Sequence, residues 1–128
     1  MHGNQKFFIC KHCGNMVGLI NDKGVPLVCC GAGMSELVPN TVEASTEKHL
    51  PLVTVSGDSV SVQVGATPHP MEEAHSISFV YVETERGGQR KRLKVGEEPT
   101  LSFNFSNDKP LAVYAYCNLH GLWKTEVK

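Results

Sequence analysis

From Leu50 onward, the chain alternates apolar and polar residues over short stretches. In segment 59–64 three valines alternate with two serines and a glutamine, and in segment 101–105 leucine and phenylalanine alternate with serine and asparagine. Side chains two residues apart point to the same face of a strand, so each segment has one apolar face. Turn signals rich in Gly, Asn and Asp separate such segments at intervals of roughly ten residues.

This pattern predicts seven strands in the C-terminal part of the chain. The predicted strands are Leu52–Val55, Val60–Val64, Ile77–Val82, Gln89–Lys94, Thr100–Phe105, Leu111–Tyr116 and Leu122–Val127. Short strands at regular spacing, each followed by a turn, favour an antiparallel β-sandwich. We therefore predict an all-β protein with a sandwich domain over residues 49–128.

The first 37 residues have a different pattern. They are rich in Gly and Cys and contain one short apolar stretch, Met16–Ile20, before a turn signal at Asn21–Gly24. This pattern indicates a small β module, and a module of fewer than about 40 residues usually needs a metal or a disulfide to stay folded. Residues 38–48 are mostly polar and include Pro39, which predicts a linker that leads into a loop or one short helical turn.

Composition excludes several classes of partner. The chain has 12 basic and 13 acidic residues and a net charge of -1, so it offers neither a broad basic face for nucleic acid nor a polybasic membrane segment. No apolar run approaches the roughly 18 residues of a membrane span, and the N-terminus lacks the apolar centre of a signal peptide. We expect a cytoplasmic protein that binds neither nucleic acid nor membranes.

Cysteine usage points to metal binding. Of the five cysteines, four lie between residues 10 and 30, and such clustering favours thiolate ligands over disulfides. Cys10 and Cys13 form a C-x2-C pair, whereas Cys29 and Cys30 are adjacent. Four thiolates suit tetrahedral iron or zinc, and a structural zinc site is an open alternative. We expect a distorted tetrahedron, because adjacent cysteines spread their sulfurs poorly, and a solvated side chain at His12.

A second candidate site lies in the C-terminal part. Its members are His49, His69, His75, Cys117 and His120. All five fall at predicted strand ends or loops, and such loops meet at one end of a sandwich. A single loop histidine is usually solvated, but four of them with a C-x2-H pair indicate one shared metal. Four imidazoles and a thiolate exceed the tetrahedral preference of zinc and favour five-coordinate iron with an open position, suited to reducing a small oxygen species.

Together these motifs resemble the desulfoferrodoxin family, the two-iron class of superoxide reductase. The resemblance covers essentially the whole chain and is carried by Cys10-x2-Cys13, Cys29-Cys30, Glu47-Lys48-His49, His69-Pro70-Met71-Glu72-Glu73, His75 and Cys117-Asn118-Leu119-His120-Gly121. It implies a desulforedoxin-like module over residues 1–37, a linker over 38–48 and an immunoglobulin-like sandwich over 49–128. It also implies two iron ions per chain, one at Cys10, Cys13, Cys29 and Cys30, and a catalytic one at His49, His69, His75, His120 and Cys117.

The resemblance further implies an activity and its partners. Superoxide would be reduced to hydrogen peroxide for detoxification, with electrons from rubredoxin or a similar donor, by a homodimer. Lys48 would attract superoxide and help to deliver a proton through water, and Glu47 would ligate the ferric iron after turnover. From the residues alone, a solvated charge pair is the favoured interpretation of these two side chains, because charge runs usually face water. One departure from the family pattern is Ala115, where several members carry an acid.

Two questions stay open at this point. The cysteine cluster also resembles rubredoxin-type centres, so an electron carrier or metal-binding module without superoxide chemistry is the rival interpretation. The four-cysteine centre could relay electrons, or its metal could have a mainly structural role in a module with so little core.

Overall fold

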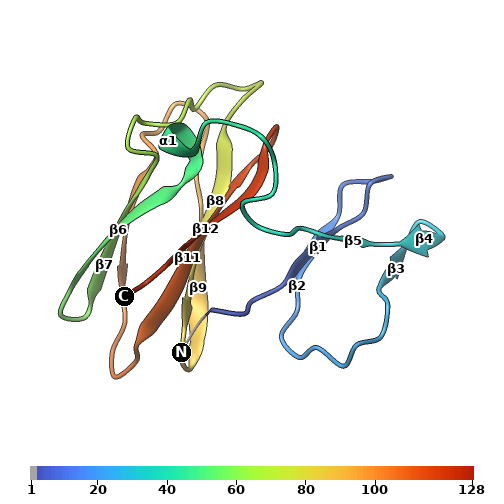
Figure 1. The fold of residues 1–128 in the computed structure, drawn as a ribbon, viewed down its shortest axis with the longest axis horizontal. Helices are drawn as coiled ribbons and strands as arrows, with labels where there is room; N and C mark the ends of the chain where they lie inside the picture. The colour runs from blue at the N-terminus through green and yellow to red at the C-terminus, as the bar shows by residue number, and fades with distance from the viewer. Residues whose placement is uncertain (1–2) are drawn as a thin grey trace. The chain divides into compact units, whose positions relative to one another are not determined.

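The computed structural model describes residues 3–128, which form two compact units (Figure 1). The smaller unit spans Asn4–Val38, and the larger unit consists of Pro39–Lys128 together with Gly3. The functional division into a module over residues 1–37, a linker over 38–48 and a catalytic domain over 49–128 stays a prediction.

The smaller unit is built from five very short strands. These are β1 (Phe7–Ile9), β2 (Met16–Gly18), β3 (Val28–Cys29), β4 (Ala32–Gly33) and β5 (Ser35–Glu36). Strands β2, β1 and β5 form one antiparallel sheet in that order, and β3 pairs with β4 in a separate hairpin. Among the residues described, Phe7 and Cys10 are the buried apolar side chains of this unit. The unit therefore has almost no hydrophobic core.

The larger unit begins with one helical turn and continues as seven strands. The turn is α1 (Thr46–His49), and the strands are β6 (Pro51–Ser56), β7 (Ser59–Val64), β8 (Ile77–Thr84), β9 (Gly87–Arg92), β10 (Thr100–Asn104), β11 (Pro110–Cys117) and β12 (Gly121–Glu126). The predicted seven-stranded sandwich is confirmed, with strand ends shifted by one or two residues. Within residues 3–128, no helix has the length and apolar character needed to cross a bilayer.

The seven strands form two antiparallel sheets, ordered β10-β7-β6 and β12-β11-β8-β9. In the constant-type immunoglobulin arrangement, the fourth strand belongs to the same sheet as the first, second and fifth. Here the fourth strand, β9, instead pairs with β8 in the other sheet. The unit is therefore an immunoglobulin-like sandwich with a switched edge strand.

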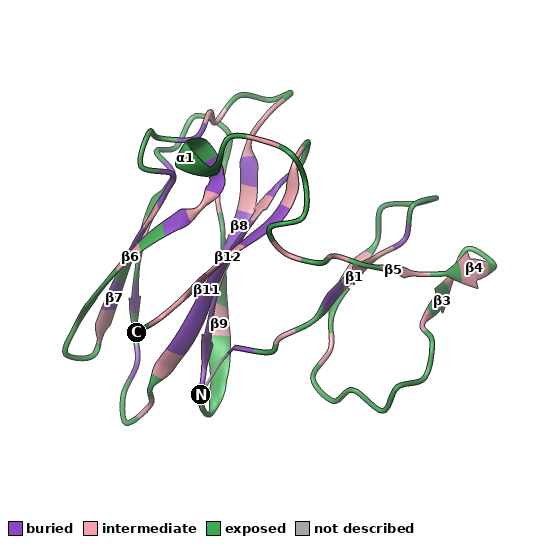
Figure 2. Ribbon diagram, viewed as in Figure 1, coloured by how far each residue is buried: buried purple, intermediate pink, exposed green. Residues whose placement is uncertain are grey.

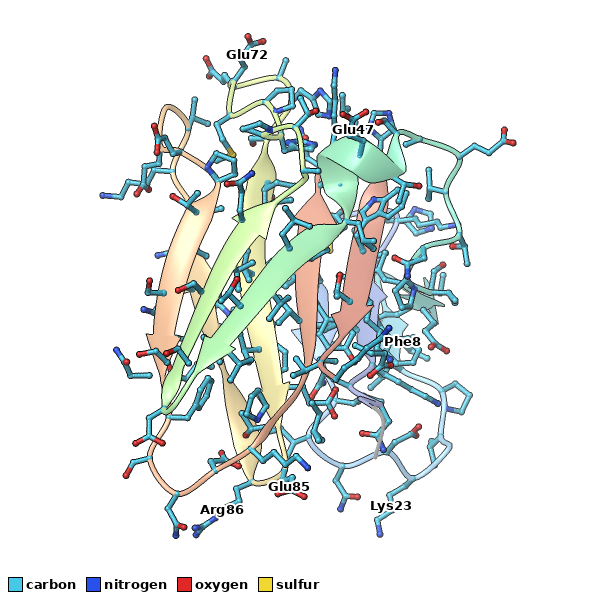
Figure 3. The ribbon with its side chains drawn as sticks, turned by 60° about the vertical axis from the view of Figure 1, so that its left-hand side comes forward. Phe8, Lys23, Glu47, Glu72, Glu85 and Arg86 are labelled. Carbon is cyan, nitrogen blue, oxygen red and sulfur yellow. The ribbon has the colours of Figure 1, made fainter. Side chains whose placement is uncertain are left out.

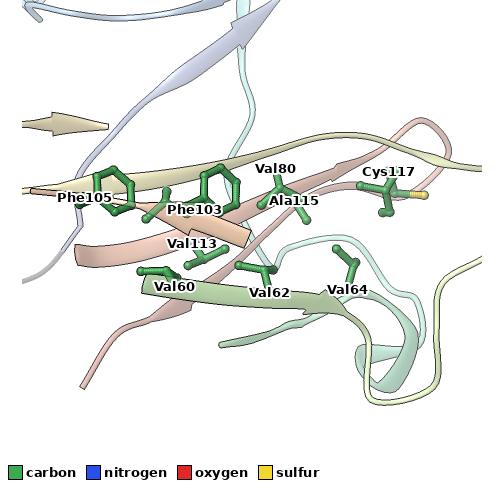
Figure 4. Packing of buried hydrophobic residues seen from close by; sticks show 11 residues of the cluster. Val60, Val62, Val64, Val80, Phe103, Phe105, Val113, Ala115 and Cys117 are labelled. Carbon is green, nitrogen blue, oxygen red and sulfur yellow. The ribbon is translucent and has the colours of Figure 1, made fainter. Parts of the chain in front are cut away.

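The core fills the space between these sheets (Figure 2). Val60, Val62 and Val64 of β7 face Val113 and Ala115 of β11 in Figure 4. Because the alternating residues of each strand point to opposite faces, the polar residues between the valines lie on the outer face. Cys117 lies at one end of this core and is fully buried (Figure 4).

Candidate metal centres

The four histidines and Cys117 converge at one end of the sandwich. His49 ends α1, His69 and His75 lie in the connection from β7 to β8, Cys117 ends β11, and His120 lies in the turn before β12. Glu47 and Glu72, which belong to two of these segments, stand together at this end in Figure 3. The segments are far apart in the sequence but meet because the sandwich brings its loops together.

The four imidazole rings form a square. The ring centroids of neighbouring histidines lie 4.7 Å apart for His49 and His69, 4.7 Å for His69 and His75, 5.1 Å for His75 and His120, and 4.9 Å for His120 and His49. The His49–His75 diagonal is longer, at 6.3 Å. Neighbouring rings meet nearly edge to face, which lets each ring turn one nitrogen toward the centre.

Hydrogen bonds select which nitrogens face the centre. The Nδ1–H of His49 donates to the carbonyl oxygen of Ser45 over 2.6 Å, and the Nδ1–H of His69 donates to that of Pro70 over 2.7 Å. Each bond places the ring proton on Nδ1 and so leaves Nε2 unprotonated and able to act as a ligand. The Nε2 atoms of His69 and His75 are buried with no hydrogen-bond partner. Because such unpaired buried nitrogens are costly, a bound cation would relieve them.

Cys117 completes the donor set. Its sulfur and the ligand nitrogens of His49, His69 and His75 all lie within 4.8 Å of one another. His120 approaches through Nδ1, which lies 3.1 Å from His49 Nε2 and 3.8 Å from Cys117 Sγ. The backbone N–H of His120 also donates to that sulfur over 3.4 Å. Four nitrogens around one sulfur fit iron better than tetrahedral zinc.

Burial favours the neutral form of two of the imidazoles, those of His69 and His49. It lowers the pKa of His69 to about 4, although the hydrogen bond to Pro70 acts in the opposite direction. Burial also lowers the pKa of His49. A metal binds only an unprotonated ring nitrogen. At neutral pH the rings of His69 and His49 therefore need not release a proton before they bind a metal.

The four clustered cysteines meet in the smaller unit. All are free thiols, and their sulfurs lie within 4.8 Å of one another. The two-residue turn between β3 and β4 consists of Cys30 and Gly31, both with positive φ, at 54° and 73°. Positive φ at both positions is the signature of a type I′ hairpin turn. This turn reorients the backbone at Cys30, which lets the adjacent sulfurs of Cys29 and Cys30 face one centre.

The thiols of this cluster do not ionise equally. The backbone N–H of Cys13 lowers the pKa of Cys10 to about 6, whereas hydrogen bonding with Cys13 raises the pKa of Cys30 to about 12. A cation is needed to hold all four as thiolates, since a thiolate is the form that binds metal. His12 is exposed and does not belong to the group.

The sequence model of the Desulfoferrodoxin family matches residues 41–126, which is more than half of the chain. The chain belongs to the desulfoferrodoxin family. A desulfoferrodoxin from Syntrophotalea carbinolica is 41% identical over 117 residues, covering 91% of this chain and 92% of its own. A second, from Nitratidesulfovibrio vulgaris, is 37% identical over 126 residues, covering 98% of this chain and 99% of its own.

Solved structures extend this similarity to the fold. The superoxide reductase from Treponema pallidum aligns with a TM-score of 0.81 and 34% identity, over 97% of this chain and 100% of its own. The superoxide reductase (1Fe-SOR) from Giardia intestinalis aligns with a TM-score of 0.54 and 33% identity, over 64% of this chain and 98% of its own. The first of these relatives therefore matches both units of this desulfoferrodoxin.

In this family member, Trp123 supports two of the histidines, a role that the sequence analysis missed. Its ring stacks on His49 with centroids 5.0 Å apart and planes at 25°. Its Nε1–H donates to the carbonyl oxygen of His120 over 3.1 Å. Trp123 is the chain's one tryptophan and follows the Cys117–Gly121 motif closely, but nothing in the sequence shows that its ring reaches His49.

Asn118 connects two of the converging segments. Its Oδ1 accepts from the backbone N–H of Ser76 and its Nδ2 donates to the carbonyl oxygen of Ala74, both over 3.0 Å. These bonds tie the turn that carries His120 to the loop that carries His75. The departure at Ala115 places a methyl group in the core, where the residue is fully buried.

Glu47 and Lys48 lie on α1, directly before His49, and both are exposed. The Glu47 carboxylate accepts a 2.6 Å hydrogen bond from the hydroxyl of Thr67, and its carbonyl oxygen accepts one from the Thr67 backbone N–H over 3.2 Å. Gly65, with φ of 84°, packs its Cα against the Lys48 carbonyl. The loop 65–69 therefore holds α1 in place beside His69.

Proposed function

We propose that the protein is a superoxide reductase, which converts superoxide to hydrogen peroxide with one electron and two protons. The observation that carries the proposal is the square of four histidines, with unpartnered buried nitrogens, beside the buried sulfur of Cys117. Solved relatives that bear the name superoxide reductase support it.

The five side chains would act as ligands of one catalytic iron. His49, His69 and His75 would bind through Nε2, and His120 through Nδ1. Iron held by these residues would supply the electron that reduces superoxide. The buried Cys117, bound as a thiolate, would donate electron density to the iron, which would favour giving an electron to the substrate over taking one from it.

Two charged residues of α1 would serve the same reaction. Lys48 would attract the superoxide anion and support proton delivery through water, because a cation raises the local concentration of an anionic substrate. Glu47 would close the oxidised site by ligation. Since the Thr67 hydroxyl holds Oε1 of its carboxylate, Glu47 would ligate through Oε2 or would first have to break that bond.

The four-cysteine site would hold a second iron, with zinc as the alternative. Four free thiols with sulfurs within 4.8 Å of one another support a tetrahedral metal, whichever of the two it is. Its role would be to relay electrons or to stabilise a unit with almost no core. Metal analysis with a visible spectrum distinguishes the metals, because a zinc-thiolate site is colourless.

The protein would work in the cytoplasm as a homodimer that receives electrons from a rubredoxin-like donor. Three apolar side chains of the smaller unit support a second copy as partner. Ile20, Val25 and Val28 are exposed to 103%, 74% and 69%, which is more apolar surface than so small a unit usually leaves in water. Sedimentation at micromolar concentration should give a dimeric mass; a monomer at all concentrations would contradict this.

Rapid mixing with superoxide tests the function. The reduced protein should be oxidised by one equivalent of superoxide at a rate near the electrostatically steered limit, about 10⁸–10⁹ M⁻¹s⁻¹. The Lys48→Gln variant should react about tenfold more slowly and with a weaker salt dependence, because the local attraction is lost. Lys109→Gln, at an exposed position outside the site, is the matched control. A reduced protein that does not react with superoxide would sink the proposal and favour the electron-carrier interpretation.

A further inference from the structure

The outward face of β9 carries a row of unpaired positive charges. Arg90 and Arg92 lie two residues apart, and Lys94 follows in the same alternation, so their side chains share one face. All three residues are exposed. Within residues 3–128, none of their side-chain charges lies within ion-pairing distance of a carboxylate, although the Lys94 backbone N–H donates to the Glu97 carboxylate over 2.7 Å. Arg90, Arg92 and Lys94 are called the basic strip below.

The residues between them face the opposite way, which confirms the alternation. The Lys91 ammonium lies 4.9 Å from the centroid of the Phe103 ring and donates to the carbonyl oxygen of Ser102. Leu93 packs against the hydrophobic core. Lys91 is therefore engaged with strand β10, whereas the basic strip faces solvent.

Two aromatic rings connect the basic strip to Cys117. Arg92 lies opposite Phe79 in the β8–β9 register. The Phe79 ring stacks on that of Tyr116, with centroids 5.9 Å apart and planes at 11°. Tyr116 directly precedes Cys117 on β11. An electron that arrives beside Arg92 can therefore pass through the stacked rings of Phe79 and Tyr116 and then along the backbone from Tyr116 to Cys117.

The loops around the histidines carry the opposite charge. Glu47, Glu72 and Glu73 are exposed in the segments that hold His49, His69 and His75. In Figure 3, Glu47 and Glu72 both lie at this end of the sandwich. Because Lys48 is the exposed cation beside Glu47 and Lys94 lies next to Glu97, an acidic protein would be attracted chiefly to Arg90 and Arg92.

We propose that the basic strip docks an acidic one-electron carrier protein, which delivers its electron through Phe79, Tyr116 and Cys117. This inference rests on the proposed function, because it names the face through which the oxidised centre is reduced again. One electron leaves the carrier, which is oxidised, and enters the ferric centre, which becomes ferrous. No covalent bond forms or breaks and no proton moves, and the Glu47 ligation proposed for the oxidised site would be released as the centre becomes ferrous.

The test compares two double variants with the same change in charge. Arg90→Gln/Arg92→Gln removes two charges of the basic strip. Arg86→Gln/Lys109→Gln removes two charges near the start of β9. Figure 3 shows Arg86 at the end of the sandwich that is far from Glu47, and Lys109 lies nearby because its carbonyl oxygen accepts a hydrogen bond from the Glu85 N–H. The probe is reduced rubredoxin with a negative net charge, mixed with each oxidised protein.

At low salt, the strip variant should be reduced about tenfold more slowly than the unmodified protein, and the control variant less than about twofold more slowly. Added salt should slow the unmodified protein and the control but scarcely change the strip variant. Binding is measured separately by calorimetry with both partners oxidised, so that no electron moves. There the strip variant should raise the Kd about tenfold.

Equal rates and affinities for the two double variants would overturn the docking proposal. Each variant is also reduced beforehand with dithionite and mixed with superoxide, and the strip variant should then react at the unmodified rate. The strip variant could lose rubredoxin binding while the unmodified reduced protein fails to react with superoxide. That result would overturn the proposed function but support the docking surface. The two proposals therefore fail by different measurements.

Discussion

Replacing Cys117 by serine is expected to abolish superoxide reduction and leave the four-cysteine centre unchanged. Serine preserves the side-chain volume in a fully buried position, but its hydroxyl does not ionise at neutral pH, so the electron-donating thiolate is lost. Losing an outer partner of a metal ligand typically costs 10–100-fold, so losing the ligand itself should slow oxidation by superoxide at least about 1000-fold. Stopped-flow mixing measures this rate.

The control for this variant is Ala115→Ser, which places a hydroxyl in the same buried core two residues earlier on β11. It should keep superoxide reactivity within a few-fold of the original. Both variants should retain the visible absorption of the four-cysteine centre if iron occupies it. If Cys117→Ser reacted with superoxide within tenfold of the unmodified rate, the five-ligand assignment would be wrong.

Much of the sandwich could be predicted because its strands carry their own pattern. In β7 the three valines that alternate with polar residues are the ones that enter the core. The predicted strand ends were less accurate, because pairing with the neighbouring strand determines where a strand begins and ends. Strand β9, for example, begins at Gly87, which the hairpin register pairs with Thr84. Strand β1, at three residues, is too short to show a period.

The candidate ligands could be predicted from residue type and spacing, but the groups that hold them could not. Thr67 and Trp123 are ordinary polar and aromatic residues in the sequence, and their contacts with Glu47 and His49 arise only when distant segments pack together. The Cys30–Gly31 turn shows an intermediate case. A glycine at the second turn position favours type I′ geometry, but adjacent cysteines considered by themselves predict only a distorted site.

Gly65 determines how closely α1 approaches the loop of His69. Its φ of 84° disfavours a side chain, and a Cβ there would lie 2.5 Å from the carbonyl oxygens of both Lys48 and Thr67. Gly65→Ala must therefore push α1 away from the loop, because both obstacles are backbone atoms. We expect a loss of about 2–3 kcal/mol in the free energy of unfolding, measured by urea denaturation, and iron affinity at the histidine site weakened about 10–100-fold.

Gly57→Ala separates the two causes of this effect. Gly57 also has a positive φ, of 57°, but a Cβ there would meet nothing within 4 Å. This control variant carries the backbone strain without the collision, so it should cost about 1 kcal/mol and leave iron affinity unchanged. If Gly65→Ala lost no more iron affinity than Gly57→Ala, the close contact between α1 and the loop would not position the ligands. Loss confined to Gly65→Ala would mean that the approach of two backbone segments holds His49 and His69 at the spacing that the metal needs.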